Sequence, residues 1–288
     1  MYGGFYGCPA GPPAPEAAAP GKPGKKLSAR YSVFMGTALI TGASSGLGLE
    51  FAWQLAAERN DLVLVARGAE TLEKIAEEIR QVAAVKVEVL AADLSKREDA
   101  IKVGQRVADT EKPIGLLVNN AGFGLGQEFS EGELEKEENA LNVMVRAVMI
   151  TCHYAAAEFR RRGYGGIINV SSMTSVTAQG TYSAHKAWVR TFSEGLATEL
   201  TPHGVSVTAV TPGLIHTDFH RRSEVDASQW PEIAFVPAEQ VAQAAIEACR
   251  RGRVLVTPGW LYKTLVGVAR VAPRWLVRRV AGPSLSGR

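Results

Sequence analysis

A tyrosine and a lysine four residues apart are the first side chains in this sequence that could perform acid–base chemistry. Tyr182 and Lys186 begin and end the segment Tyr-Ser-Ala-His-Lys, and a spacing of four places two residues on one face of a helix. A phenol with a pKa of about 10 is a poor acid at neutral pH, but a neighbouring ammonium stabilises the phenolate and lowers that pKa. The pair is therefore a candidate for proton transfer to a carbonyl oxygen, with an ordinary helix start as the alternative.

A glycine-rich segment near residue 40 could hold a phosphate group. An apolar run ends at Ile40, the segment Thr-Gly-Ala-Ser-Ser-Gly-Leu-Gly follows, and a helical pattern begins near Leu49. Glycines let the chain turn tightly and approach a pyrophosphate, and the N-terminus of the next helix favours an anion. We predict a dinucleotide-binding turn rather than a purely structural loop. Its contact residues would be Gly42, Ser44, Ser45, Gly46, Leu47 and Gly48.

The ends of the next two predicted strands bear on the choice of cofactor. An NAD site usually has an acid after the second strand to accept the ribose 2′-hydroxyl, whereas this strand ends in Val-Ala-Arg67. Because Arg67 could pair with a 2′-phosphate, we predict that NADP(H) is favoured over NAD(H). Asp93 and Leu94 follow the third strand. Asp93 could accept a hydrogen bond from the adenine amino group, or it could instead cap the next helix.

Short β-rich runs alternate with longer helical patterns, which is typical of repeated βα units. The strands are predicted at 37–40, 62–65, 85–90, 115–119, 166–170, 205–210 and 253–257, and the helices at 46–59, 70–82, 98–110, 133–162, 182–201 and 238–250. The pattern predicts a single α/β domain with a Rossmann-type, doubly wound, seven-stranded parallel sheet and helices on both faces.

Composition divides the chain into three parts. Residues 1–34 are rich in Gly, Pro and Ala and are predicted to be disordered, with Met35 as an alternative natural start. Residues 35–258 form the dinucleotide-binding domain. The hydrophobic content of 46% and charged content of 21% are ordinary for a globular protein. Three widely spaced cysteines, no apparent signal peptide and no long apolar run favour the cytoplasm.

Residues 259–288 combine apolar and basic side chains. No acid follows Glu247, although the whole chain carries a net charge of only +3. We predict a basic amphipathic helical tail that contacts an anionic membrane surface or covers a substrate entrance. The alternative is that the tail packs on the domain or on a neighbouring subunit. Beyond this charge, nothing indicates nucleic-acid binding.

Six features in one order identify a family resemblance that extends from Met35 to Thr257. They are the glycine-rich loop, Asn119-Asn120-Ala121-Gly122 after the fourth strand, Asn142 in the long helix, Ser172 after the fifth strand, Tyr182 with Lys186, and Pro212-Gly213 with Thr217. Together they resemble the short-chain dehydrogenase/reductase family.

The resemblance implies a role for each matched residue. Tyr182 would be the general acid in reduction, and Ser172 would donate a hydrogen bond to the substrate oxygen. Lys186 would hold the nicotinamide ribose and tune Tyr182, while Asn142 would anchor a water in a proton relay. Cofactor contacts would also come from Asn120, Ala121, Gly122, Pro212, Gly213 and Thr217, with Asn119 lining the same groove. The resemblance further implies a homodimer or homotetramer.

The loop before the tyrosine departs from the family pattern. Ser172 lies ten residues before Tyr182, whereas familiar members have about thirteen, so Ser171 or Ser175 could take its place. We predict an NADP(H)-dependent oxidoreductase that interconverts a ketone and a secondary alcohol, in the reductive direction. Apolar residues between 214 and 236, namely Phe219, Trp230 and Phe235, favour a lipophilic substrate. The alternative is a protein that binds NADP(H) as a sensor or scaffold without turnover.

Other polar residues are given structural interpretations. His216 and His220 have a spacing that could bind a metal, but no carboxylate or cysteine cluster accompanies them, so no metal site is predicted. His185 is interpreted as a surface position. The acidic run from Glu131 to Glu138 is interpreted as a solvated face at a helix start.

Overall fold

The computed structural model describes residues 36–215 and 234–282, which belong to one unit spanning Tyr31–Arg288. Several predictions concern residues outside these ranges: the disordered extension at 1–34, the cofactor contact Thr217, the histidines His216 and His220, and the apolar residues Phe219 and Trp230.

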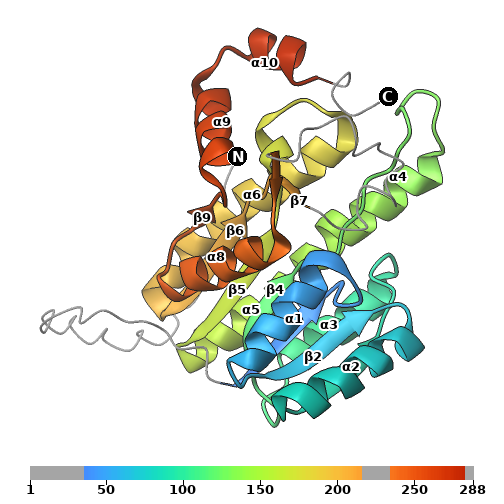
Figure 1. Cartoon of the computed structure of the whole chain (residues 1–288), viewed down its shortest axis with the longest axis vertical. Helices are drawn as coiled ribbons and strands as arrows, with labels where there is room; N and C mark the ends of the chain where they lie inside the picture. Colours follow the sequence, from blue (N-terminus) through green and yellow to red (C-terminus); the bar gives the residue numbers. More distant parts are fainter. Residues whose placement is uncertain (1–35, 216–233, 283–288) are drawn as a thin grey trace, which may run out of the picture. The chain divides into compact units, whose positions relative to one another are not determined.

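Seven parallel strands form the central sheet in the order β3-β2-β1-β4-β5-β6-β9 (Figure 1). Their bounds are Thr37–Thr41 (β1), Asp61–Ala66 (β2), Val87–Ala91 (β3), Ile114–Asn119 (β4), Gly165–Val170 (β5), Val205–Val210 (β6) and Leu255–Val256 (β9). All seven predicted strands are confirmed, with ends within two residues of prediction. The strand order reverses between β1 and β4, and ligands of such sheets bind at the carboxyl ends of strands beside this switch point.

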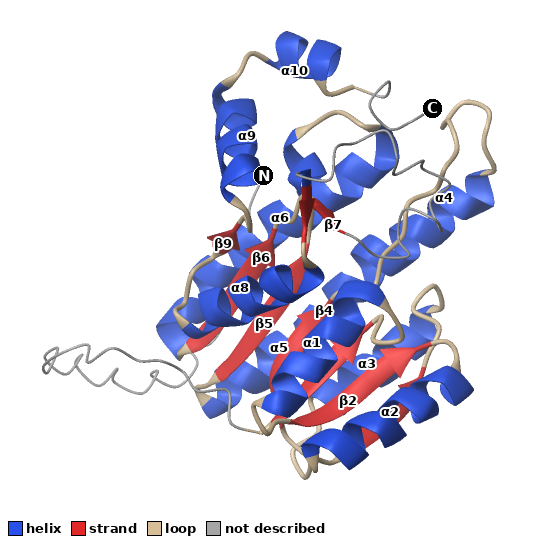
Figure 2. Ribbon diagram, in the orientation of Figure 1, coloured by secondary structure: helices blue, strands red, loops and turns tan. Residues whose placement is uncertain are grey.

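Helices cover both faces of the sheet, as predicted (Figure 2). One face is covered by α1 (Gly46–Ala57), α2 (Ala69–Ala83) and α8 (Ala238–Arg250), which bury Phe51, Leu72 and Ile246 against it. The other face is covered by α3 (Arg97–Val107), α5 (Ala147–Arg162) and α6 (Gly180–Leu200). The inner strands β1, β2 and β4 read as nearly continuous apolar runs because both of their faces are buried.

The predicted helix at 133–162 is interrupted in the structure. It consists of α4 (Leu134–Leu141), a π turn η1 (Asn142–Arg146) and α5. Such turns insert an extra residue into a helix and often occur at functional sites. The whole stretch is long and apolar enough to cross a membrane by length and composition alone, but half of its most apolar part is buried in the fold. We interpret it as a core helix.

The C-terminal tail forms two helices instead of one. These are α9 (Trp260–Val271) and α10 (Arg274–Val280), separated at Pro273, which cannot continue a helix because it lacks an amide hydrogen. Tyr262, Val266 and Val277 are buried, so the tail packs on the domain. It lies against the 3₁₀ turn η2 (Met173–Val176). A short parallel pair, β7 (Leu214–Ile215) and β8 (Phe235–Val236), and the turn η3 (Thr201–His203) complete the described elements.

Candidate active site

The glycine-rich loop joins β1 to α1 in a tight turn. Gly42 and Gly46 have φ angles of +67° and +55°, a region that L-residues with side chains rarely adopt. A Cβ on Gly48 would lie 2.2 Å from the carbonyl oxygen of Gly42, so only glycine lets α1 approach the loop this closely. Ser45, at the N-cap of α1, makes no side-chain capping bond. The amides of the first turn are therefore suited to an anion, and this cradle fits a dinucleotide.

The turn after β4 is hydrogen-bonded to the glycine-rich loop. Oγ1 of Thr41 accepts bonds from the backbone amides of Asn120, at 3.0 Å, and Ala121, at 3.1 Å. Nδ2 of Asn120 donates to the carbonyl oxygen of Thr41 at 3.0 Å. These bonds cross the point where the strand order reverses, so they fix the two sides of the predicted cofactor groove relative to each other.

Asn119 does not line this groove, contrary to the sequence-based expectation. Its side chain is buried and donates to Oδ1 of Asn169 at 2.9 Å, and its own Oδ1 accepts from Oγ1 of Thr151 at 2.8 Å. Asn119 points from β4 into the core, where its amide is satisfied by β5 and α5. It is a structural residue in a buried polar network.

The predicted adenosine contacts lie at the ends of neighbouring strands. Arg67 follows β2 and is exposed, while Asp93 and the buried Leu94 follow β3. Burial opposes ionisation of Asp93, but hydrogen bonds from Ser95 and the charge of Arg67 outweigh it and lower the pKa of the carboxyl. The N-cap residue of α3 is Lys96, so Asp93 does not cap that helix.

The predicted acid, Tyr182, lies two residues into α6 and is hydrogen-bonded to Ser172. Burial raises the pKa of Tyr182, and the bond to Ser172 only partly offsets that increase. This direction is opposite to the one that the lysine spacing predicted. Lys186 lies on the same side of the helix as Tyr182, as predicted. Its ammonium lies over the ring of Tyr182, 5.7 Å from the ring centroid. Without cofactor, Tyr182 is therefore protonated at neutral pH, as a general acid must be.

Lys186 is enclosed by protein. Its Nζ donates to the carbonyl oxygen of Val170, at the end of β5, at 2.9 Å, and its side chain is buried. A Cβ on Gly122 would lie 3.3 Å from the same Nζ, so the turn after β4 is in close contact with the ammonium. Burial lowers the pKa of Lys186 to about 8.

Of the three candidate serines, only Ser172 is bonded to Tyr182. Its Oγ also accepts from the backbone amide of Thr174 at 3.1 Å, which fixes its position at the start of η2. Oγ of Ser171 donates to the carbonyl oxygen of Lys186 at 2.7 Å. Oγ of Ser175 is buried without a hydrogen-bond partner in the described part of the chain. The geometry therefore favours Ser172 despite the short loop.

The fourth predicted catalytic residue is Asn142, and its role stays a prediction. It lies in η1 and lines an open polar pocket of about 470 Å³ with Ser95, Glu133, Glu135, Lys136, Glu138 and Asn139. Met144 of η1 is buried, and its Sδ would lie 3.4 Å from a Cβ on Gly122. The sequence pattern did not predict the π turn.

Two residues interpreted as surface positions are buried, one on α6 and one beside it. Glu137 on α4 is only 8% exposed; it accepts from Oγ1 of Thr181 at 2.6 Å and from Nε2 of Gln127 at 3.1 Å. His185 is also 8% exposed, and burial lowers its pKa while the charge of Glu137 opposes that change. The interpretation of His185 was wrong. The acidic run is a solvated face at Glu131, Glu133, Glu135 and Glu138, which are exposed, but Glu137 turns towards the residue preceding Tyr182.

The segment after β6 contacts the tail. A Cβ on Gly213 would overlap the ring of Tyr262, and the carbonyl oxygen of Pro212 accepts from the amide of Met173 at 2.8 Å. Pro212 and Gly213 therefore support η2 and α9. Whether they also approach a cofactor remains a proposal, together with the roles of the residues above.

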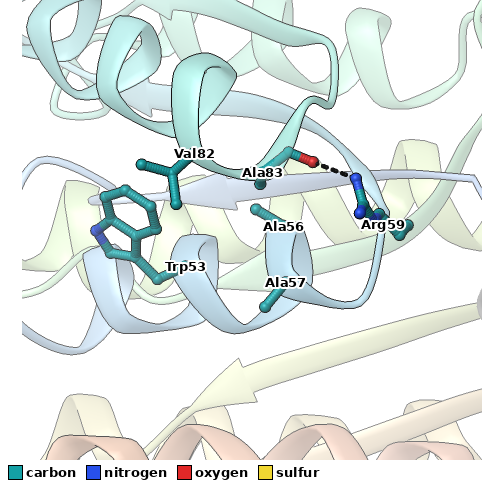
Figure 3. Close-up of a pocket in the computed structure, with 6 residues that line it drawn as sticks. All are labelled: Trp53, Ala56, Ala57, Arg59, Val82 and Ala83. Atoms are coloured by element: carbon teal, nitrogen blue, oxygen red, sulfur yellow. Dashed lines mark hydrogen bonds between the residues drawn. The ribbon is translucent and has the colours of Figure 1, made fainter.

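Two further features of the described residues carry no predicted chemistry. They contain no group of three or more His, Cys, Asp or Glu side chains that could hold a metal ion. A small pocket of about 190 Å³ lies between α1 and α2 and is lined by Trp53, Ala56, Ala57, Arg59, Val82 and Ala83 (Figure 3). Arg59 bonds to the carbonyl oxygen of Ala83 there, so we interpret this pocket as a seam between helices.

The fold and the glycine-rich cradle define an α/β dinucleotide-binding oxidoreductase, and comparisons with known proteins identify the family. Residues 36–227 match the short chain dehydrogenase family, so the chain belongs to the short-chain dehydrogenases/reductases. An uncharacterised oxidoreductase of Mycobacterium tuberculosis is 32% identical over 250 residues, which cover 84% of this chain and 96% of that protein.

Two solved structures share the fold at useful levels of identity. A short-chain dehydrogenase from Sphingobium yanoikuyae in complex with NADPH has a TM-score of 0.75 and 32% identity, over 82% of this chain and 94% of the other. A bulky-bulky ketone specific alcohol dehydrogenase from Comamonas testosteroni has a TM-score of 0.70 and 28% identity, over 83% of this chain and 95% of the other. The family and the fold predicted from the sequence are confirmed.

Proposed function

We propose that this chain reduces a lipophilic ketone to a secondary alcohol with NADP(H). The observation that carries the proposal is that four predicted parts of the site are contiguous. The glycine-rich loop is bonded to the turn at Asn120, Gly122 of that turn contacts Lys186, and Tyr182 and Ser172 are bonded to each other beside it. Groups from four separate stretches of sequence thus converge at the carboxyl ends of β1, β4 and β5.

In this proposal, the chain's own residues bind the ketone and supply its proton. When bound, the nicotinamide supplies hydride. Tyr182, protonated because burial raises its pKa, gives its proton to the carbonyl oxygen as negative charge develops there. Ser172 stabilises the same oxygen by a hydrogen bond. Lys186, held by the carbonyl oxygen of Val170, would orient the ribose and supply positive charge near the phenol.

A panel of lipophilic ketones, followed by NADPH absorbance, tests the proposal. Wild type is expected to oxidise NADPH only when a suitable ketone is present, and Tyr182→Phe to lower kcat by ~10² or more while leaving NADPH affinity nearly unchanged. NADPH binding without ketone-dependent oxidation across the panel would instead support the sensor or scaffold function.

A preference for NADP(H) over NAD(H) is supported by Arg67, which is exposed at the end of β2 and close enough to Asp93 to influence its charge. We expect Arg67→Glu to lower the NADPH:NADH ratio of kcat/KM by about tenfold to a hundredfold, because a carboxylate repels the 2′-phosphate. Arg160→Glu, an exposed change at the end of α5, is the matched control. An unchanged ratio in Arg67→Glu would remove the assignment.

A bulky, apolar ketone is supported by the Comamonas enzyme's preference and by Phe235 at the start of β8. Phe235 pairs with Leu214, and Leu214 directly follows the Pro212-Gly213 segment. Aryl and cyclic ketones should therefore give higher kcat/KM values than acetone-sized ones. The reverse order would contradict this substrate class.

A homodimer or homotetramer through the helices that hold Asn142 and Tyr182 is supported by Leu141 and Met149, which are exposed on the first of these two helical stretches. Light scattering on wild type and Met149→Glu tests it: a dimer or larger particle that dissociates in the variant is expected.

A cytoplasmic, reducing location is supported by Cys152 and Cys249, which are both buried as free thiols. Burial raises the pKa of each thiol to about 12.

Peripheral membrane contact is supported by the composition of α9 and α10. Their exposed apolar residues are Trp260, Leu265, Val268, Val271, Trp275, Leu276 and Val280, and their basic residues are Lys263, Arg270, Arg274, Arg278 and Arg279. Exposed tryptophans beside cations suit an anionic lipid surface. Vesicles containing phosphatidylserine should bind wild type and the Val82→Ser control, but not the double variant Trp260→Ser, Trp275→Ser. Equal binding of all three proteins would contradict the contact.

A further inference from the structure

Glu137 on α4 is buried, although the charged residues on either side of it in the sequence are exposed. Its Oε2 accepts a 2.6 Å hydrogen bond from Oγ1 of Thr181, and its Oε1 accepts a 3.1 Å bond from Nε2 of Gln127. A carboxylate is costly to bury unless hydrogen bonds replace its water. These two bonds, one on each oxygen, therefore hold the side chain in one position between two other parts of the chain.

Gln127 connects this carboxylate to the segment between β4 and α4. Its Nε2 also donates to the carbonyl oxygen of Glu133 at 3.1 Å, and its Oε1 accepts from the amide of Glu133 at 3.0 Å. Glu133 is the N-cap residue of α4. The Gln127 side chain thus closes this segment onto the start of α4 and binds Glu137 one helical turn further on.

The other oxygen of Glu137 binds the first turn of α6. Thr181 is the second residue of α6 and directly precedes Tyr182. The N-cap residue Gln179 makes no side-chain capping bond in the described part of the chain, and the sequence of the first turn, Gly-Thr-Tyr-Ser, contains no acid. Because a helix N-terminus favours negative charge, the carboxylate of Glu137 supplies from α4 what the turn itself lacks.

His185 shows that this contact extends along α6. It lies four residues after Thr181, so the two side chains share one face of the helix. Burial lowers the pKa of His185, and the charge of Glu137 opposes that change. The carboxylate therefore lies beside the face of α6 that carries Thr181 and His185.

The first turn of α6 also carries the proposed acid. Tyr182 is hydrogen-bonded to Ser172, and the loop between them is shorter than in familiar relatives. A general acid must lie within hydrogen-bond distance of the atom that it protonates, and small displacements of such groups are costly. A contact that fixes Thr181 therefore bears on where the phenol of Tyr182 points.

We propose that Glu137 is a positioning residue for the reaction: by binding Thr181 it fixes the first turn of α6 and keeps the phenol of Tyr182 directed at Ser172. The inference rests on the proposed function, because it concerns the proposed acid. Glu137 acts through Thr181 and not on the substrate.

The test removes the bond from each side. Glu137→Leu removes both acceptor oxygens at similar size, and Thr181→Val removes the hydroxyl at the same shape in case the first variant does not fold. Thr181→Ser retains the hydroxyl. The matched controls are Glu131→Gln, an exposed change in the same acidic run, and Thr198→Val, an exposed change later in α6.

The Tyr182 phenol is followed in each free protein by the NMR signal of its labelled Cζ, identified by its absence in Tyr182→Phe. Ser172→Ala gives the position of this signal without the bond to Ser172. The kcat and KM values with NADPH and a ketone are measured in parallel, and Glu137→Leu is also made in the Tyr182→Phe background.

In Glu137→Leu and Thr181→Val, we expect the Tyr182 signal to move towards its position in Ser172→Ala. Their kcat should fall by about tenfold to a hundredfold, because the acid is displaced. The KM for NADPH should stay unchanged, because the glycine-rich loop is not touched. Thr181→Ser should keep kcat within about twofold of wild type, since its hydroxyl can donate the same bond. Both controls should match wild type. In the Tyr182→Phe background, Glu137→Leu should cause no further loss, because two changes that act through one group are not additive.

A wild-type Tyr182 signal in both Glu137→Leu and Thr181→Val would overturn the proposal. So would an equal loss of kcat from Glu137→Leu with and without the phenol, since that is the result of a purely structural role. If wild type reduces no ketone, the proposed function fails. The Tyr182 signal still decides whether Glu137 positions the phenol, because it needs neither cofactor nor substrate.

Discussion

The guanidinium of Arg274 donates a 3.0 Å hydrogen bond to the carbonyl oxygen of Val176, nearly a hundred residues earlier in the chain. It also donates to the carbonyl oxygen of Thr177, and the amide of Ala178 donates to the carbonyl oxygen of Ala281. The tail thus supports the segment between Ser172 and Tyr182, which is shorter than in familiar relatives. We infer that α10 supplies contacts that hold this loop in place.

Arg274→Ala should loosen that loop. A hydrogen bond from a charged donor typically contributes about 1.5–3 kcal/mol, and its loss leaves two backbone carbonyls without this partner. We expect a lower Tm and a reduced kcat/KM with little change in NADPH affinity, because the glycine-rich loop is not touched. Arg279→Ala, an exposed change in the same helix, is the control. Equal behaviour of the two variants would show that the bonds do not stabilise the loop.

The sequence predicts the sheet and the cofactor loop well, because both depend on local patterns. Apolar runs and a glycine turn need only neighbouring residues to be interpreted. The position of the π turn is different, because no feature of the helical pattern marks where η1 interrupts the long helix.

The sequence also did not predict which side chains are buried by contacts with distant parts of the chain. Glu137 is one of several glutamates in its run, and only its contact with Thr181, 44 residues away, distinguishes it. The tail is a second example. It contacts η2, and no periodic pattern in the sequence predicts that contact. The amphipathic pattern of each segment indicates that one face is covered, but not by which element.

Ser172→Ala should lower kcat by ~10² or more, since a positioned donor to the substrate oxygen is lost. The other two serines serve as internal comparisons. Ser171→Ala removes a bond to the carbonyl oxygen of Lys186 and should cost about 1 kcal/mol of stability, whereas Ser175→Ala removes a buried hydroxyl without a described partner and should be neutral or stabilising. Steady-state kinetics and thermal melts separate the three. A larger kinetic loss in Ser175→Ala than in Ser172→Ala would reverse the assignment.

Gly48→Ala should abolish measurable NADPH binding. The added Cβ would clash with the carbonyl oxygen of Gly42, so α1 must move away from the loop. We expect this to lower the free energy of unfolding by about 1–3 kcal/mol. Gly195→Ala provides the opposite control: no atom lies within 4 Å of its added Cβ, and an alanine in a helix interior is about 0.5–1 kcal/mol more favourable than glycine. NADPH titration by fluorescence, with melts of both variants, checks the pair. Retained NADPH binding by Gly48→Ala would contradict the tight cradle.

Lys186 should make stability depend on pH in a specific window. Burial lowers its pKa from 10.5 to about 8, so between these values the unfolded chain binds a proton that the folded chain does not. The free energy of unfolding contributed by this group therefore rises with pH across the window, and below pH 8 the full cost of burying the charge remains. At about 1.4 kcal/mol per pKa unit, this cost is about 3 kcal/mol, reduced in practice by the bond to Val170.

Lys186→Met should consequently be inactive yet more stable than wild type at pH 7, by up to about 3 kcal/mol, with the advantage shrinking towards pH 10. Urea unfolding at a series of pH values measures this difference directly. Lys102→Met, an exposed change on α3, should show a difference that does not vary with pH in the same window. A constant difference for Lys186→Met would mean that its ammonium is hydrated, because only a buried lysine releases its proton before the unfolded chain does.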